Sequence, residues 1–272
     1  MIRALVLAAA LTLATAGTVT PQTRQAATEV DLQLVLAVDI SYSMDPEEQR
    51  LQREGYLQAM VSPDVMDAIR RGLIGKIAVS YVEWAGAHEQ QVVIGWRIID
   101  GPESAQAFVD ELRAKPYRRA FRTSISGAIN ASVSLLESSG LRSQRRVIDI
   151  SGDGSNNNGM LVEPARDAAL AKGIVINGLP IMLFRPNNRY ADVANLDAYY
   201  QDCVVGGPGS FVIPIKTPEE FVPATRRKLI LEVAGIVPLW PMPDMPMVVP
   251  AQSERTDCLI GERIWRERWE RN

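Results

Sequence analysis

The chain has 272 residues, of which 47% are hydrophobic, and its 29 basic residues are matched by 32 acidic ones. A chain of this length and apolar content can bury a full core, which excludes a fibrous or disordered protein and favours one domain of about 200 residues with extensions. The net charge of −3 provides no basic surface, so we expect no nucleic-acid partner.

The first sixteen residues contain the three parts of a secretory signal. Arg3 supplies a positive start, residues 5–13 an apolar stretch, and Ala14-Thr15-Ala16 a small-residue cleavage site. We therefore expect cleavage near Ala16, a linker over residues 17–30 and an exported protein, periplasmic or secreted. No other window approaches the roughly eighteen unbroken apolar residues of a membrane span, so none is expected in the mature chain.

Beyond the linker, buried strands and amphipathic helices alternate. Apolar runs and turn signals predict strands over residues 32–38, 77–84, 91–98, 146–150, 174–180 and 210–215, and helices over 46–59, 102–112, 124–138, 162–172, 196–201 and 218–234. This alternation favours an α/β fold with a doubly wound, mostly parallel sheet and helices on both faces, over residues 31–235. A Pro/Met-rich tail over residues 236–272 follows and is expected to end in a short amphipathic helix.

Oxygen-bearing side chains follow the first predicted strand. Asp39, Ser41 and Ser43 alternate in an extended segment, so their side chains point to the same side. Carboxylate and hydroxyl oxygens suit a hard cation such as Mg²⁺, which needs six ligands. Two further segments, around Thr123 and Asp153, offer the missing ligands, and the second is again a strand that runs into an acidic turn at the edge where such sheets bind ligands.

These three segments together resemble the metal-ion-dependent adhesion site of von Willebrand factor type A domains. The matching features are Asp39-x-Ser41-x-Ser43 after a buried strand, Thr123 at the start of a helix, and Asp153-Gly154 after a later strand. The resemblance covers roughly residues 31–235 and implies a von Willebrand A, Rossmann-like fold. With the leader and the glycine-rich segment after Cys203, the chain also resembles exported bacterial proteins that carry this domain.

The resemblance implies a role for each residue. Ser41 and Ser43 would bind the cation directly, with Asp39 close by or bridged through water. Thr123 would bind directly in a high-affinity state, and Asp153 directly or through water. The cation, Mg²⁺ or else Mn²⁺ or Ca²⁺, would then accept an Asp or Glu carboxylate from a protein partner, so the resemblance implies a binding module and not an enzyme.

Two neighbouring segments depart from the family pattern or extend it. Asp45 follows the second serine where a glycine is usual, and it offers a further carboxylate near the site. Three asparagines, at positions 156, 157 and 158, follow Gly154, and we expect them to form a turn whose side chains cap the backbone. The alternative is that they donate hydrogen bonds to an incoming ligand.

Two other functions remain open at this point. The string from Gly152 to Asn157 resembles the acidic turn of haloacid-dehalogenase-like, Mg²⁺-dependent phosphatases, but that chemistry needs an acid two residues after the nucleophilic aspartate, where this chain has Ser41. A structural module with a vestigial metal site is the other alternative. A zinc site of His and Cys ligands is excluded, because His88 is the only histidine.

The chain contains two cysteines, Cys203 and Cys258. In an oxidising compartment they could pair, which would join the tail to the loop before residues 210–215. Two unpaired thiols are the alternative.

Overall fold

The structure is a computed structural model that describes residues 27–183, 193–235 and 255–270, without the side chain of Trp269. The expected signal peptide, most of the expected linker and the proline-rich part of the tail lie outside the described residues.

Five strands form one sheet in the order β3-β2-β1-β4-β5. They are β1 (Glu29–Asp39), β2 (Ile77–Trp84), β3 (Gln90–Ile99), β4 (Arg142–Gly152) and β5 (Val175–Pro180). Only β3 runs antiparallel to its neighbour, which it follows through the turn that contains His88. The prediction of a mostly parallel sheet is therefore confirmed.

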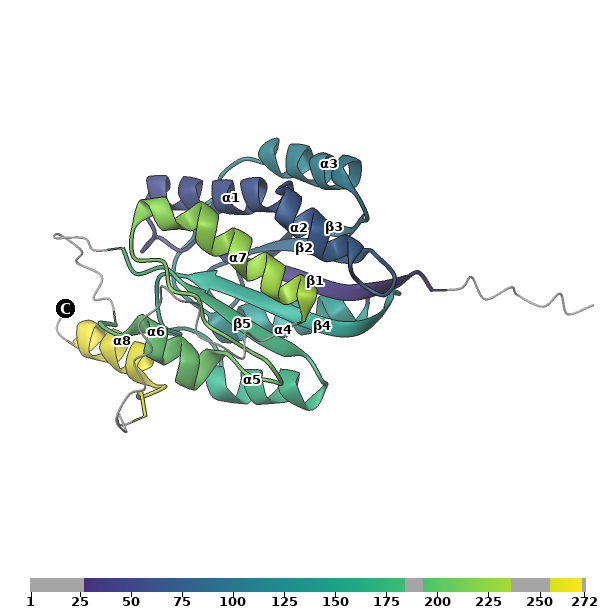
Figure 1. The fold of residues 1–272 in the computed structure, drawn as a ribbon. Helices are drawn as coiled ribbons and strands as arrows, with labels where there is room; N and C mark the ends of the chain where they lie inside the picture. The colour runs from purple at the N-terminus through teal and green to yellow at the C-terminus, as the bar shows by residue number, and fades with distance from the viewer. Residues whose placement is uncertain (1–26, 184–192, 236–254, 271–272) are drawn as a thin grey trace, which may run out of the picture.

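Helices cover both faces of the sheet (Figure 1). One face carries α1 (Pro46–Met60), α2 (Pro63–Arg70), α3 (Pro102–Arg113) and α7 (Phe221–Ala234). The other carries α4 (Ile125–Glu137), α5 (Val162–Ala171) and α6 (Leu196–Tyr199), which continues as a π-helical turn, Tyr200–Val204. The expected C-terminal helix is α8 (Ile260–Glu270), and it lies at the carboxyl end of the parallel strands. No helix in the described part of the chain is both long and apolar enough to cross a membrane.

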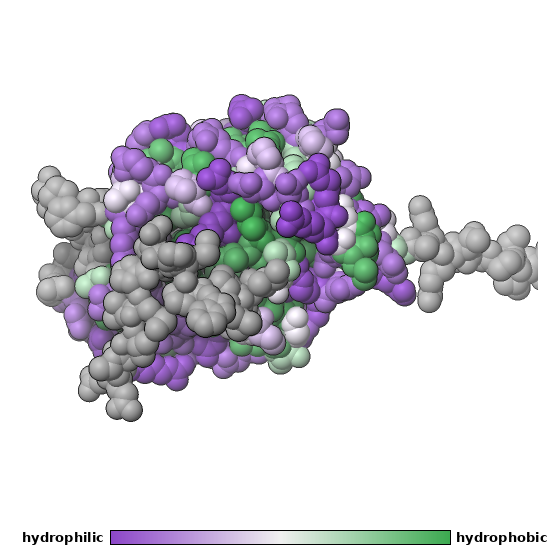
Figure 2. Space-filling view, in the orientation of Figure 1, coloured by the Kyte–Doolittle hydropathy of each residue, from purple (hydrophilic) through white to green (hydrophobic). Residues whose placement is uncertain are grey.

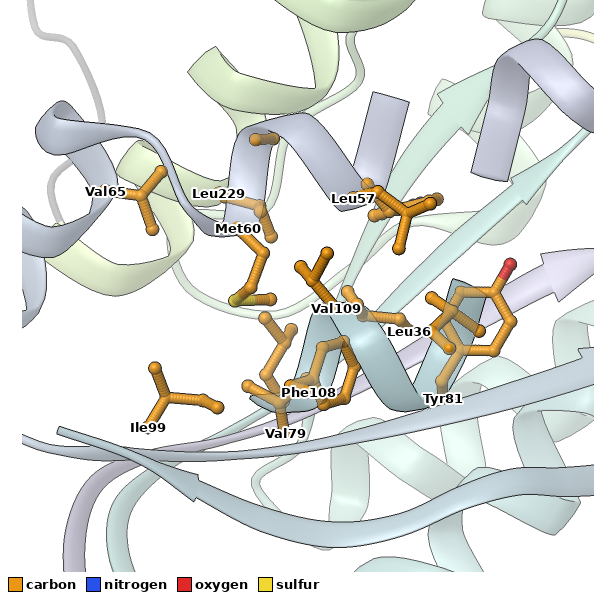
Figure 3. Packing of buried hydrophobic residues seen from close by; sticks show 14 of the residues in the cluster. Leu36, Leu57, Met60, Val65, Val79, Tyr81, Ile99, Phe108, Val109 and Leu229 are labelled. Carbon is orange, nitrogen blue, oxygen red and sulfur yellow. The ribbon is translucent and has the colours of Figure 1, made fainter. Parts of the chain in front are cut away.

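Alternate side chains of β1 build two cores. Leu34 and Leu36 face α1, α3 and α7, whereas Val35 and Ala37 face α4 and α5. Figure 3 shows the first core, where Leu36 from the sheet lies among residues of the covering helices. Each helix buries only the side that faces the sheet, so the outer surface of the helices is mostly hydrophilic in the view of Figure 2. Because β1 is buried on both faces, a one-residue slip would exchange the two cores, and this fixes its register.

The stretch predicted as a strand over residues 210–215 is not one. It lies parallel to β5 but forms only isolated bridges, at Val212 and Ile215. The N–H of Ile213 donates to the carbonyl of Gly178 and the N–H of Ile215 to that of Pro180. A continuous ladder would also need a hydrogen bond in the opposite direction, donated by the N–H of residue 180. That bond is missing because Pro180 has no N–H.

Two helices also differ from the prediction. The predicted helix 218–234 is divided into a 3₁₀ turn, Pro218–Glu220, and α7. The short helix α2 was missed, although Ser62 and Pro63 form a helix start signal, with the Ser62 hydroxyl accepting from the N–H of Val65 at 3.4 Å.

A buried charge cluster attaches α7 to the sheet. Lys228 is fully buried, and its Nζ lies 2.8 Å from Oδ1 of Asp149 on β4 and also contacts Glu232 one turn along α7. Asn177 of β5 donates to Glu232 at 3.0 Å, and the Tyr56 hydroxyl of α1 donates to Asp149 at 3.2 Å. The cluster therefore connects two helices with two strands inside the core.

The cluster contains one ammonium group and two carboxyl groups. Burial raises the pKa of Glu232 from its ordinary value of 4.5 to about 7, against the opposing effect of Lys228. Burial also raises the pKa of Asp149. The folded protein therefore holds a proton here at a pH where the unfolded chain has released it.

Replacing Lys228 should destabilise the fold strongly. In Lys228→Met the two acids lose their buried counter-charge, and we expect a loss of about 3–5 kcal/mol in the free energy of unfolding, measured by urea denaturation. Lys172→Met is the control, because Lys172 forms an exposed pair with Glu137 whose loss should cost about 1 kcal/mol or less. Equal effects of the two substitutions would contradict this account.

The cluster also predicts how stability depends on pH. Folded Glu232 binds its proton more tightly than the same group does in the unfolded chain. Its contribution to the free energy of unfolding should therefore fall as the pH rises from about 4.5 to about 7, by at most about 1.4 kcal/mol per pH unit. Glu232→Gln should flatten this part of the profile, measured by denaturation at several pH values. The exposed Glu137→Gln serves as control, and a Glu232→Gln profile parallel to the wild-type profile would refute the assignment.

Candidate metal-binding site

The parallel pairing of β1 with β4 brings two aspartates to one edge of the sheet. Asp39 is the last residue of β1, and Asp153 directly follows β4. The register pairs Val38 with Ser151, so the strands end side by side. In such sheets, the carboxyl ends of neighbouring strands form the ligand-binding edge.

A chain of hydrogen bonds joins four of the five expected site residues. The N–H of Ser41 donates to Asp39 Oδ1 at 2.7 Å, and the hydroxyls of Ser41 and Ser43 are 2.7 Å apart. The Ser43 hydroxyl donates to Asp153 Oδ1 at 2.6 Å. Residues 110 positions apart are therefore in direct contact.

Thr123, the fifth residue, faces the same cavity as Ser43 and Asp153. A Cβ atom added to Gly154 would lie 3.7 Å from the Thr123 hydroxyl, which shows how near the two turns are. Asn157 holds the threonine in place, because its Oδ1 accepts from the Thr123 N–H at 3.0 Å and its own N–H donates to the Thr123 carbonyl at 2.8 Å. The structure thus brings together all five residues that the sequence singled out.

The asparagine run joins neighbouring loops. Asn156 Oδ1 accepts from the N–H of Ser126 in α4 at 3.0 Å, and Asn158 Oδ1 accepts from the N–H of Ala87 in the β2–β3 turn at 2.7 Å. These side chains do cap the backbone, as expected, but the backbone belongs to other segments. The run therefore fixes the position of the loop that carries Thr123.

Asp45 does not supply the additional carboxylate that the sequence suggested. It is the N-cap of α1, where its Oδ1 accepts from the N–H of Glu48 at 2.8 Å and Glu48 accepts from the N–H of Asp45 at 2.9 Å. This reciprocal capping satisfies the first turn of the helix.

Asp39 is fully buried, and its Oδ2 has no hydrogen-bond partner among the described residues. Burial raises its pKa to about 7, although its hydrogen bonds with Ser41 act in the opposite direction. A buried carboxylate oxygen without a partner is costly, and a cation would satisfy it.

Sequence reasoning missed two residues beside Asp39. A Cβ atom on Gly152 would lie 2.7 Å from Asp39 Oδ2 and 3.1 Å from the hydroxyl of Tyr200, so only glycine fits there. The buried Tyr200 hydroxyl is likewise without a hydrogen-bond partner in the described ranges. The only sequence signal was the glycine before Asp153, because Tyr200 belongs to a distant helix.

The donor set determines which kind of ion fits. Within the described residues, no group of three or more His, Cys, Asp or Glu side chains is placed to hold a metal. The available donors are two carboxylates and three hydroxyls, which suit Mg²⁺, Mn²⁺ or Ca²⁺ better than a soft metal.

A family model matches most of the chain. Residues 29–237 match the family model described as "Protein of unknown function (DUF1194)". The chain belongs to this family. No curated protein matches the chain significantly.

Solved structures with the same fold are distant in sequence. Proximal thread matrix protein 1 from the mussel byssus, with a zinc-occupied MIDAS motif, has 13% identity and a TM-score of 0.52 over 75% of this chain and 46% of its own. The pilus adhesin SpaC from Lactobacillus rhamnosus GG has 10% identity and a TM-score of 0.55, over 75% and 31%. A von Willebrand factor type A protein from Catenulispora acidiphila has 12% identity and a TM-score of 0.52, over 75% and 43%.

These likenesses establish the fold of this DUF1194 member as that of a von Willebrand factor type A domain. The match spans less than half the length of each of these three proteins. What those proteins bind is therefore a property of those proteins, and this chain shares their fold.

Helix α8 lies beyond the segment that matches the family model, yet it packs against the site. Asn156 Nδ2 donates to Glu262 at 2.8 Å, and the Arg122 guanidinium lies 3.5 Å from the ring centroid of Trp265. Gly261 packs so closely that a Cβ atom there would lie 2.0 Å from the Asn156 carbonyl oxygen. Sequence reasoning predicted this helix but not its position.

The hypothesis that the two cysteines pair is confirmed. Cys203, in the π-helical turn after α6, forms a disulfide with Cys258, two residues before α8. The bridge holds α8 at the site by a covalent bond.

Reducing this bridge should destabilise the protein and release α8. A disulfide across 55 residues typically contributes about 2–4 kcal/mol, so the variant with both Cys203→Ala and Cys258→Ala should lose about this amount in denaturation experiments. Limited proteolysis should then cut residues 255–270 faster than the rest of the domain. Cleavage at an unchanged rate would show that the contacts of Glu262 and Trp265 hold the helix without the bridge.

Proposed function

We propose that this protein is an exported binding module that uses a divalent cation to bind a carboxylate of a protein partner. The observation that carries the proposal is the convergence of Asp39, Ser41, Ser43, Thr123 and Asp153, from three distant segments, on one edge of the sheet. The orphaned oxygen of buried Asp39 supports a cation there. So does the zinc-occupied MIDAS motif of the mussel protein with the same fold.

Each residue has a part in this proposal. The hydroxyls of Ser41 and Ser43 would bind the cation directly, while Asp39 would lie close by or be bridged to it through water. Thr123 and Asp153 would complete the protein's share of the ligands. With few anionic ligands, the bound cation, Mg²⁺ or else Mn²⁺ or Ca²⁺, would keep a strong attraction for an Asp or Glu carboxylate of a partner.

The chemistry of the site supports binding over catalysis. Phosphatase chemistry of the haloacid-dehalogenase type needs an acid at position 41, and the Ser41 hydroxyl is hydrogen-bonded to Ser43. The one histidine, His88, is exposed in the β2–β3 turn.

Export is supported by two features. Residues 1–16 have the composition of a signal peptide, and the disulfide between Cys203 and Cys258 suits an oxidising compartment. A periplasmic or secreted location agrees with a fold that is shared with a pilus adhesin and a byssus matrix protein.

Cation binding should raise the melting temperature. At a Mg²⁺ concentration of about one hundred times Kd, a site present only in the folded state adds about 2.7 kcal/mol, or about 5–10 °C for a domain of this size. The double variant Ser41→Ala, Ser43→Ala should lose this increment, whatever its own stability. Ser134→Ala, which removes an exposed serine of α4, should retain it. A wild-type protein that does not respond to Mg²⁺, Mn²⁺ or Ca²⁺ would favour the vestigial-site alternative.

Partner capture should depend on the same cation. We expect the immobilised protein to retain a protein from an envelope or culture extract in Mg²⁺ and to release it in EDTA. Thr123→Ala should retain much less, and Ser134→Ala should retain as much as the wild type. Capture that persists in EDTA would contradict the cation-dependent mechanism.

A further inference from the structure

A cavity of about 220 Å³ lies beside the site residues. Ser43, Thr123 and Asp153 line one side of it, and Ile264, Trp265 and Arg268 of α8 line the other. Small-molecule sites usually measure about 300–1,000 Å³, so this cavity suits a single large side chain better than a whole metabolite.

Two exposed aromatic rings border the cavity. Phe121 is 73% exposed and Tyr42 is 40% exposed, and their ring centroids are 4.4 Å apart. A paired aromatic surface beside a cavity is characteristic of protein-binding sites, because such rings lose little conformational entropy on binding and bury a large area.

The backbone before Thr123 is strained. Arg122 has a φ of 74°, the single positive value among non-glycine residues of the described chain. This conformation costs about 1–3 kcal/mol and is typically retained where the position of a side chain matters. It places the guanidinium over the ring of Trp265, on the wall of the cavity.

The charges of the cavity indicate what it receives. Among the described residues that line it, Arg122 and Arg268 are basic and Asp153, which is hydrogen-bonded to Ser43, is the single acid. Together with a bound cation, this wall attracts an acidic segment and disfavours a basic one. Its Trp265, Phe121 and Tyr42 side chains add an apolar surface.

We propose that this cavity is a side-chain subsite that receives a large apolar side chain, preferably aromatic, adjacent to the partner carboxylate that the cation binds. The partner is then a protein with an exposed acidic segment in which Asp or Glu lies within about two residues of Phe, Tyr, Trp or Leu. This inference rests on the proposed function of the cation site. Helix α8 is the element that gives this chain its specificity.

The test uses random heptapeptides displayed on phage and selected on the immobilised full-length protein in Mg²⁺. We expect enriched peptides to contain Asp or Glu near a large apolar residue and to be released by EDTA. A synthetic enriched peptide should bind about tenfold or more tightly than the same peptide with its apolar residue replaced by Ala. Trp265→Ala and Phe121→Ala should abolish this ratio but retain the requirement for the acid.

Controls separate the subsite from the cation site. Phe121 is exposed, so its replacement should not disturb folding. Leu73→Ala, which removes another exposed apolar residue that does not line the cavity, should leave the ratio unchanged. Two results would overturn the subsite and leave the proposed cation function standing. In the first, the peptides need the acid and the cation but show no apolar preference; in the second, the apolar preference is unchanged in Trp265→Ala and Phe121→Ala. Peptides without an acid, binding that resists EDTA, or no enrichment would overturn both proposals.

Discussion

The pairing of β1 with β4 is the constraint on which the rest of the structure depends. These strands lie at the centre of the sheet, are parallel, and end together, so Asp39 and Asp153 meet although they are far apart in sequence. Both faces of β1 are buried, which fixes the register. A shift of one residue would turn Asp39 to the opposite face and separate it from Ser43 and Asp153.

Polar side chains inside the domain have two separate tasks. The charge cluster of Lys228, Asp149 and Glu232 attaches α7 to the sheet, and its burial cost is reduced by hydrogen bonds from Tyr56 and Asn177. The polar groups at the site serve positioning instead. There the asparagines after Gly154 bind the backbone of neighbouring loops, while one oxygen of Asp39 is left without a hydrogen bond in the described structure. In the first arrangement Lys228 supplies a counter-charge to both acids, whereas in the second no basic side chain is paired with Asp39 in the described structure.

The C-terminal helix lies outside the matched family segment but beside the candidate site. The matched family segment ends at residue 237, whereas α8 begins at Ile260 and still forms a wall of the cavity. Its attachment combines a covalent bond through Cys258, a hydrogen bond from Asn156 to Glu262, and the stacking of Arg122 on Trp265. Three kinds of contact therefore hold α8 beside the candidate site.

The sequence by itself determined the alternation of strands and helices and the five oxygen-bearing residues, because apolar periodicity and short motifs are local properties. It did not determine that residues 210–215 fail to form a strand, since that depends on Pro180 of a neighbouring strand. The cap formed by Asp45 was within reach of sequence reasoning, because its partner Glu48 is three residues away and the two form a capping box. The sequence did not, however, place Tyr200 beside Asp39 or α8 beside Thr123. Contacts between distant segments decide these features, and only the packed tertiary structure brings those segments together.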